Sequence, residues 1–254
     1  MINQIHHIDA FELLAYLPNE SVDLILTDPP YGTTYNSWDA DIDLNIFFSE
    51  AFRVLTKRGL AIIFGNQPFT SKVVCAMGKR YRAEYVWAKN PIGHLTSGYR
   101  PMRNHENIIV GALLPMSPTG NQQAYYAPYT SITVKTEMKP KKVSSKSWLD
   151  PTVTNWKIKT KWTRRQNMPN TIMRFPNDKG FHPTQKPVEL LKHLIRLHCP
   201  EDGIVLDPFS GSGSTAVAAI QTGRRYIASE LDPVYLAKSR ARLSAVQMDL
   251  LVAT

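Results

Sequence analysis

The sequence predicts an α/β fold: a mostly parallel, twisted sheet with helices on both faces. Three observations support this prediction. Short apolar runs rich in β-branched residues recur between turn residues, which is typical of strands buried on both faces. Segments with helical spacing lie between these runs, and strands that alternate with helices form parallel sheets. Two polar turns directly follow apolar runs, and open α/β sheets bind their ligands at such positions.

These patterns place the expected elements along the chain. The apolar runs that we predict to be strands are residues 22–27, 60–64, 108–110, 204–206 and 225–228. The segments with helical spacing are residues 44–55, 188–197, 216–220 and 233–248. The first helix is expected to stop at Gly59, Pro187 to start the second, and Asp232 to cap the last. Residues 104–107, which precede the 108–110 strand, are expected to be mostly structural.

Residues 115–175 lose this alternation and are expected to form an insertion with irregular structure of its own. Within them, residues 135–165 hold eight Lys and two Arg against two acidic residues, a net charge of +8 out of +9 for the whole chain. A block of this kind is often only a solvated face. Here Trp148, Trp156 and Trp162 lie among the cations, and this mixture favours a polyanion that offers both phosphates and bases.

Several classes of protein are disfavoured by the composition. The chain of 254 residues has no apolar run near the roughly 20 residues that span a bilayer, and no secretory signal, so we expect no membrane partner. Cys75 and Cys199 are isolated, which provides no metal spacing or disulfide framework and suits a cytoplasmic location. His6 and His7 fall on alternate faces of a strand and are taken as structural, so no metal is expected.

The first polar turn is Asp28-Pro29-Pro30-Tyr31, directly after the 22–27 run. Two prolines make the turn rigid and remove two N–H donors, which leaves its carbonyl groups as acceptors. Asp28 adds a second acceptor and Tyr31 a flat ring. Two acceptors and a ring suit an aromatic amine, although a simple Pro-Pro turn with a helix cap is the alternative.

The second polar turn runs from Asp207 to Thr215, between a predicted strand and a predicted helix. Gly211 and Gly213 allow positive φ and a close approach of a ligand to the backbone. The turn lacks the lysine of a P-loop and the full pattern of a dinucleotide-binding loop. Glu230 ends the next predicted strand, where a carboxylate can accept hydrogen bonds from ribose hydroxyls. Together these features favour an adenosine-containing cofactor over a tight structural turn.

The order of these motifs resembles that of the β group of DNA amino-methyltransferases. The resemblance covers nearly the whole chain outside the insertion and includes residues 22–31, His182-Pro183-Thr184-Gln185-Lys186-Pro187 and residues 207–215. It implies a Rossmann-like methyltransferase fold with a circularly permuted motif order, in which the N-terminal run would be the sheet strand that follows the 233–248 helix in space although it comes first in the sequence. It also implies a basic target-recognition insertion. We therefore expect a catalytic part over 1–114, the insertion over 115–175 and a cofactor-binding part over 176–254.

The resemblance also assigns roles to individual residues. Asp28, Pro29, Pro30 and Tyr31 would be catalytic, and Asp9 matches an acidic position in the base pocket. The cofactor would be S-adenosylmethionine, with the following residues around it: Asp207, Phe209, Ser210, Gly211, Gly213, Glu230, Thr184, Gln185 and Lys186. The charge pattern suggests double-stranded DNA contacts from Lys139, Lys141, Lys142, Lys157, Lys159, Lys161, Arg164 and Arg165. A homodimer and a cognate restriction endonuclease are further partners that this family suggests.

The expected reaction is methyl transfer to N6 of an adenine flipped out of the duplex. Asp28 favours adenine, because the cytosine-N4 enzymes of the family more often carry Ser there. A 5-methylcytosine enzyme would need a nucleophilic cysteine in a Pro-Cys turn, and neither Cys75 nor Cys199 lies in one. Three alternatives stay open: cytosine-N4 methylation, an inactive DNA-binding protein with this fold, and methylation of RNA or of a protein glutamine.

Overall fold

The centre of the fold is an eight-stranded mixed sheet in a computed structural model that describes residues 1–32, 41–89, 103–114, 170–178 and 185–252. The strands of this sheet are β1 Gln4–His6, β2 Val22–Thr27, β3 Leu55–Gly65, β4 Tyr81–Ala88, β5 His105–Ala112, β6 Ile172–Arg174, β7 Ile204–Asp207 and β8 Arg225–Ser229. Their order across the sheet is β1-β8-β7-β2-β3-β5-β4-β6. All neighbours are parallel except β5, which is antiparallel to β3 and β4.

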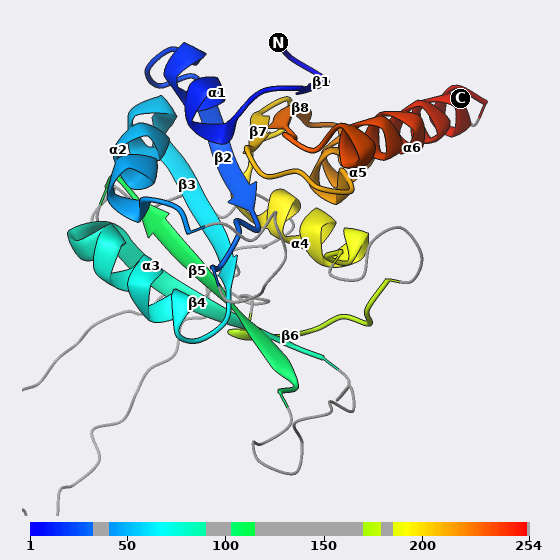
Figure 1. The fold of residues 1–254 in the computed structure, drawn as a ribbon. Coiled ribbons are helices and arrows are strands. Elements are labelled where there is room, and N and C mark those ends of the chain that lie inside the picture. The colour runs from blue at the N-terminus through cyan, green and yellow to red at the C-terminus, as the bar shows by residue number, and fades with distance from the viewer. Residues whose placement is uncertain (33–40, 90–102, 115–169, 179–184, 253–254) are drawn as a thin grey trace, which may run out of the picture. The chain divides into compact units, whose positions relative to one another are not determined.

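Helices cover both faces of this sheet, as Figure 1 shows, with α1, α2 and α3 on one face and α4 and α5 on the other. The helices are α1 Ala10–Tyr16, α2 Leu44–Val54, α3 Phe69–Met77, the short 3-10 helix η1 Gly78–Arg80, α4 Val188–His198, α5 Ser214–Gln221 and α6 Pro233–Val252. The core beneath α1, α2 and α3 contains Leu14, Phe47 and Val73 from the helices and Ile25 and Ile63 from the sheet. None of the helices in the described residues is long and apolar enough to cross a membrane.

Burial on both faces explains why the central strands are continuous apolar runs. Leu24, Ile25 and Leu26 follow one another in β2, and none of them is exposed. Successive side chains of a strand point to opposite faces, so Ile25 faces one helical layer while Leu24 and Leu26 face the other. The alternating α/β arrangement predicted from the sequence is therefore confirmed, and the sheet is mixed because β5 is antiparallel to both of its neighbours.

One predicted boundary is wrong. The helix that begins at Leu44 was expected to continue to Gly59, but α2 ends at Val54 and β3 starts at the next residue. Leu55 pairs with Val22 of β2, and the register shifts between this pair and the one that joins Leu24 to Leu60. A Cβ on Gly59 would lie 2.8 Å from Leu55 Cδ2 and 3.1 Å from the Val22 carbonyl oxygen. Gly59 therefore allows an irregular strand to lie against β2.

Both ends of the sheet bring together segments that are distant in the sequence. The N-terminal strand β1 pairs in parallel with β8, the strand that precedes α6. At the other edge β6, within residues expected to be irregular, pairs in parallel with β4. The basic residues between 139 and 165 and Thr184 lie outside the described residues.

Candidate active site

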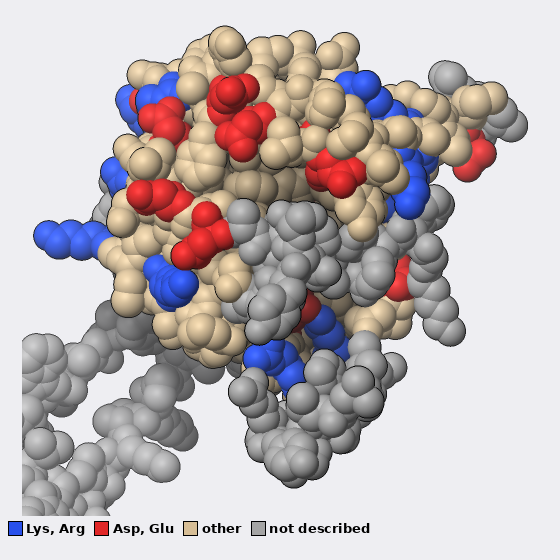
Figure 2. Space-filling view, viewed as in Figure 1, with Lys and Arg blue, Asp and Glu red and all other residues tan. Residues whose placement is uncertain are grey.

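A cleft of about 580 Å³ opens where β2, β7 and β8 end. It is lined by both polar turns of the sequence, by Glu106 of β5 and by residues near the start of α6. Six carboxylate side chains line it: Asp9, Asp28, Glu106, Asp207, Glu230 and Asp232. Figure 2 shows Asp and Glu side chains around the hollow in the face drawn. Lys186 is the one basic side chain among the described residues that line the cleft. The lining is therefore strongly acidic.

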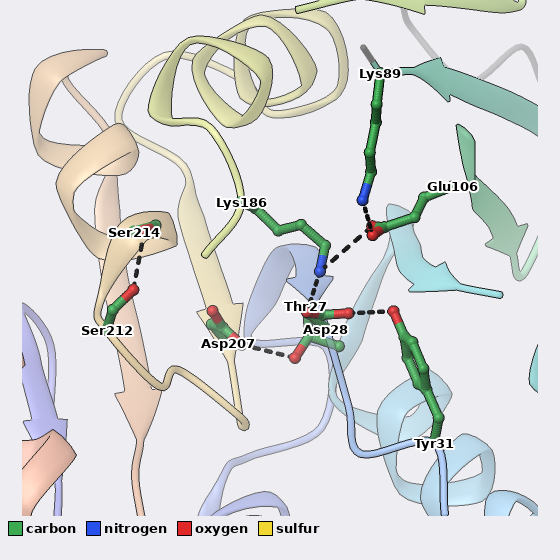
Figure 3. Close-up of polar contacts among 9 residues, drawn as sticks. All are labelled: Thr27, Asp28, Tyr31, Lys89, Glu106, Lys186, Asp207, Ser212 and Ser214. Atoms are coloured by element: carbon green, nitrogen blue, oxygen red, sulfur yellow. Dashed lines mark hydrogen bonds and ion pairs between the residues drawn. The ribbon is translucent and has the colours of Figure 1, made fainter. Parts of the chain in front are cut away.

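The Asp28 turn forms one wall of this cleft. Asp28 follows β2 directly, and its side chain is held from within the turn because the Tyr31 hydroxyl donates a hydrogen bond to Oδ1 at 2.5 Å. The Tyr31 ring stacks on Phe69 of α3, with 4.8 Å between the ring centroids and 27° between the planes. Pro29 and Pro30 line the same wall. The turn thus presents a carboxylate and a supported aromatic ring side by side, as Figure 3 shows for Asp28 and Tyr31.

Lys186 reaches the same carboxylate from the opposite side. Its ammonium contacts Asp28 Oδ2 and lies 3.4 Å from Glu106 Oε2, while Lys89 contacts the other oxygen of Glu106. Burial alone would lower the pKa of Lys186, but the charges of Asp28 and Glu106 outweigh burial and raise it. Burial would likewise raise the pKa of Glu106, but Lys186 and Lys89 lower it. Lys186 and Glu106 are therefore both charged near neutral pH.

This position refines what was expected of Lys186. The sequence predicted that Gln185 and Lys186 would close over a cofactor, and both line the cleft just before α4. The ammonium of Lys186, however, points to the Asp28 turn, as Figure 3 shows. Within the described residues Gln185, in contrast, makes no contact with the Asp28 turn that would match that of Lys186. Its Oε1 is buried, and its amide nitrogen lies 3.5 Å from Asp178 Oδ2.

The glycine turn forms the other wall of the cleft. Gly211 has φ of 51° and Gly213 has φ of 75°, a backbone conformation that side chains with a Cβ rarely adopt. The backbone N–H of Gly211 donates to Glu230 Oε2 at 2.7 Å, and the N–H of Asp232 donates to Oε1 at 2.8 Å. Burial raises the pKa of Glu230, although these hydrogen bonds oppose the shift. Glu230 thus ties the turn to the end of β8.

Asp207 and Thr27 connect the two walls. The Thr27 hydroxyl at the end of β2 donates to Asp207 Oδ1 at 2.6 Å, and the N–H of Phe209 donates to the same oxygen at 3.2 Å. Burial raises the pKa of Asp207 to about 6, despite these hydrogen bonds, and the nearby charge of Asp28 adds to the effect. Strands β2 and β7 are direct neighbours, so this contact sets the spacing between the two turns.

Two buried polar atoms of the cleft, Gln185 Oε1 and Ser210 Oγ, lack a hydrogen-bond partner within the described part of the chain. Buried polar atoms in native proteins nearly always have partners, so unpaired ones in a cleft indicate where a polar ligand binds. A Cβ added to Gly211 would meet nothing within 4 Å, which leaves space beside the backbone. The cleft therefore fits a polar ligand, and its carboxylates suit a cationic one.

The remaining predicted residues near the cleft have clear structural partners. Asp9 lines the cleft and also caps α1, because its Oδ1 accepts the N–H of Phe11 at 2.8 Å. His6 and His7 place a ring nitrogen 2.9 Å from the carbonyl oxygen of Met1 and 3.0 Å from that of Leu231, respectively. Among the described residues, no cluster of His, Cys, Asp or Glu is arranged to hold a metal ion.

Three side chains at the site were missed by the sequence analysis. Glu106 was expected to be mostly structural, yet it lines the cleft. Lys89 and Phe69 were not singled out, yet Lys89 contacts Glu106 and Phe69 stacks on Tyr31. Glu106 could have been suspected because it is a charged residue at the start of a strongly apolar strand. The positions of Lys89 and Phe69 depend on tertiary contacts that no local pattern reveals.

Comparisons with known proteins identify the family and the fold of this chain. The profile of the N6/N4 DNA methylase family matches residues 22–240. DNA adenine methyltransferase YhdJ of Escherichia coli is 29% identical, over 93% of this chain and 81% of that protein. The crystal structure of M1.HpyAVI with SAM has a TM-score of 0.62 at 24% identity, covering 94% of this chain and 98% of that one. The cytosine-N4-specific PvuII DNA methyltransferase has a TM-score of 0.63 at 16% identity, covering 93% and 84%.

The matched region contains both walls of the cleft, from β2 through the glycine turn to the start of α6. The two solved structures share the fold along nearly the whole chain. This chain therefore belongs to the N6/N4 DNA methylase family.

Proposed function

We propose that this protein transfers a methyl group from S-adenosylmethionine to N6 of an adenine that is flipped out of double-stranded DNA. The observation that carries the proposal is the meeting of two turns in one cleft. The Asp28 turn offers acceptors and an aromatic ring, and the glycine turn faces it across the hydrogen bond between Thr27 and Asp207. An amine and a methyl donor bound at these two walls would be brought into contact.

The glycine-turn wall has the chemistry that S-adenosylmethionine requires. This cofactor carries a positive sulfonium, and the acidic lining of the cleft would attract it. We assign the methionine end to Asp207, Phe209, Ser210, Gly211 and Gly213, and the ribose to Glu230. Ser210 Oγ, which has no hydrogen-bond partner among the described residues, and the space beside Gly211 support this assignment. Gln185, whose buried Oε1 likewise has no partner in the described part of the chain, and Thr184 would contact the cofactor from the other side.

The Asp28 wall would activate the target nitrogen. When bound, S-adenosylmethionine would supply an electrophilic methyl group, so that a new N–C bond would form as the S–C bond breaks and a neutral thioether leaves. The amine lone pair is delocalised into the base ring, which makes the nitrogen a weak nucleophile. Asp28 and the Pro29 carbonyl would accept its two N–H groups and favour a pyramidal nitrogen. The proton released by the nitrogen would pass to the Asp28 carboxylate.

The aromatic ring of the turn would hold the base itself. A base within a duplex cannot reach this cleft, so it must be flipped out. Tyr31 would stack on the base, and Phe69 would support the Tyr31 ring from behind. Asp9 would line the base pocket while it continues to cap α1.

The choice of adenine rests on Asp28. Either an aspartate or a serine can accept a hydrogen bond from an amine, so the physical chemistry alone does not distinguish N6 of adenine from N4 of cytosine. The cytosine-N4-specific PvuII enzyme shares the fold, and the fold therefore leaves cytosine as the second candidate. Aspartate at this position resembles the adenine enzymes and favours adenine.

We assign DNA contacts to the basic residues between 135 and 165, with 1–114 as the catalytic part, 115–175 as the target-recognition insertion and 176–254 as the cofactor-binding part. The acidic cleft would repel phosphates, so a separate basic region is needed to hold the duplex. Neutralising Lys139, Lys141 and Lys142 should weaken DNA binding. The slope of log affinity against log salt concentration should become shallower by about one for each lost phosphate contact.

A homodimer and a cognate restriction endonuclease are further partners that we propose for this protein.

The decisive experiment is incubation with unmethylated genomic DNA and S-adenosylmethionine, followed by sequencing that maps modified bases. The expected result is N6-methyladenine within one short sequence context. Modified cytosine would transfer the proposal to N4 methylation. Saturable cofactor binding without any modified base would contradict the proposed activity and indicate an inactive DNA-binding protein.

A further inference from the structure

Four charged side chains alternate in sign along one wall of the cleft. Lys89 contacts Glu106, Glu106 lies 3.4 Å from Lys186, and Lys186 contacts Asp28. We call these four residues the charge network. They come from the end of β4, the start of β5, the loop before α4 and the end of β2, and Figure 3 shows them converging. Two positive and two negative charges make the network neutral.

The charge network is largely shielded from solvent. The exposed fraction of the side chain is 8% for Lys186 and 11% for Glu106, compared with 29% for Asp28. A buried charge without a partner is strongly unfavourable, so removal of one member leaves its neighbour uncompensated. Such groups therefore hold each other in one arrangement.

Asp28 needs this support because its carboxylate group can rotate about the terminal side-chain torsion. The terminal torsion of an aspartate has a broad energy minimum, so a carboxylate held at one oxygen can still rotate. Here the Tyr31 hydroxyl holds Oδ1 at 2.5 Å and the Lys186 ammonium holds Oδ2. Each carboxylate oxygen can accept two hydrogen bonds, so Asp28 keeps acceptor capacity for a bound amine.

We propose that Lys186 is a positioning residue for methyl transfer, whose ammonium, held in turn by Glu106 and Lys89, fixes the Asp28 carboxylate in the orientation that meets the target amine. This inference rests on the proposed function of Asp28. It gives Lys186 a different task from its neighbour Gln185: Lys186 acts on the amine side of the cleft and does not determine cofactor affinity. The effects of mutation should therefore diminish along the network from Lys186 to Glu106 to Lys89.

The first test compares Lys186→Met with wild type in single-turnover methylation of genomic DNA. We expect the rate constant to fall roughly 100-fold, as for a catalytic group displaced by about 1 Å, while the Kd values for cofactor and DNA stay within about twofold. The matched control is Lys192→Met, which removes a lysine from α4 that is paired with Glu189 outside the cleft. A rate within about twofold of wild type, or a weaker cofactor Kd with an unchanged rate, would overturn the proposal.

The second test measures the methylation rate as a function of pH, because a residue with a purely structural role would not change the pH dependence of this rate. The charged groups that face Lys186 are Asp28 after β2 and Glu106 on β5, with Lys89 and Asp207 one contact further away. From β3 the Phe64 ring faces Lys186, with its centroid 5.2 Å from the ammonium. Glu106→Gln removes one of the two carboxylates that raise the pKa of Lys186. Lys186 should then lose its proton at a lower pH, and the methylation rate should fall in alkaline buffer where the wild-type rate does not.

A double variant makes this test specific. In Glu106→Gln with Lys186→Arg, the side chain at 186 stays charged at every usable pH, so the alkaline fall should disappear. An alkaline fall that persists in the double variant, or a Glu106→Gln profile identical to wild type, would refute the role of Lys186. Wild-type protein without methylation activity would instead refute the proposed function, so the two failures are distinguishable. Unfolding midpoints for each variant would separate loss of positioning from loss of the fold.

Discussion

The two walls of the cleft are built in different ways. The donor side, which we define as residues 207–213 with Glu230, depends on backbone conformation: two glycines with positive φ and a carboxylate that accepts backbone N–H groups. The acceptor side, defined as the Asp28 turn with the charge network, depends on side chains from four distant segments. The backbone of the donor side provides a surface whose shape fits a ligand. The ion pairs of the acceptor side instead hold the Asp28 carboxylate in one orientation. Binding and chemistry should therefore respond to different mutations.

The largest expected effect is on the acceptor side, from Asp28→Ala. This change removes the acceptor at the target nitrogen, and loss of one preorganised hydrogen-bonding group at a reacting centre costs about 1000-fold in rate. Cofactor affinity should be nearly unchanged because Asp28 lies on the opposite wall. Single-turnover methylation and a cofactor titration would measure the two quantities. Full activity of the variant would remove Asp28 from the reaction.

Asp207 lies where the two walls meet, and its burial predicts a pH effect on stability. Burial raises the pKa of Asp207 from the ordinary aspartate value of 3.8 to about 6, so the folded state disfavours the ionised form. Stability from this group is present below about pH 4 and is lost as pH rises through about 6. The free energy of unfolding of the wild type should therefore fall by about 2 kcal/mol between pH 4 and pH 7 because of this group, and Asp207→Asn should abolish that fall.

The measurement for Asp207 is urea unfolding at several pH values. The matched control is Asp43→Asn, because Asp43 is an exposed carboxylate that caps α2 and asparagine caps a helix equally well. If Asp207→Asn kept the wild-type pH dependence, the ionisation of Asp207 would not be coupled to folding.

The third effect belongs to the donor side. Glu230→Gln keeps the size of the side chain but places an amide NH2 where one carboxylate oxygen accepts a backbone N–H. Charge-assisted hydrogen bonds are stronger than neutral ones, so the cofactor Kd should rise about 10-fold. The rate at saturating cofactor should stay close to wild type. A large fall in that rate with unchanged affinity would contradict the separation of the two walls.

The same contrast explains how much could be predicted from the sequence. The donor side is a contiguous stretch next to an apolar strand, so Gly211, Gly213 and Glu230 were identified from local spacing. The structure joins Gly211 and Glu230 by a hydrogen bond, whereas Gly213 is not among the described residues that line the cleft. The Asp28 turn is also local. The pair of Lys186 with Asp28 joins residues separated by 158 positions, and no local pattern states which charges will meet. The same limit applies to Phe69 behind Tyr31 and to β6 beside β4.

The boundary error at Gly59 has a related cause. Apolar spacing suggested that the helix from Leu44 would continue, and glycine is a common helix stop. In the structure, pairing of Leu55 with Val22 overrides this local preference, and Gly59 is needed inside a strand. Local signals thus identified which elements exist, while contacts between strands determined where this helix ends.

The smallest predicted effects concern the two glycines of the donor side, where one substitution should mainly reduce stability and the other should mainly reduce cofactor affinity. An alanine at Gly211 would have positive φ but open space around its Cβ, so the cost should be about 1 kcal/mol of strain. An alanine at Gly213 would also have positive φ, and its Cβ would lie 3.0 Å from Ser239 Cβ of α6. Gly213→Ala should therefore lower the thermal midpoint more, whereas Gly211→Ala, with its new methyl group in the cleft, should weaken cofactor binding more. Equal losses of stability and affinity in both variants would show that the two glycines serve the turn alone and that Gly211 does not face the ligand.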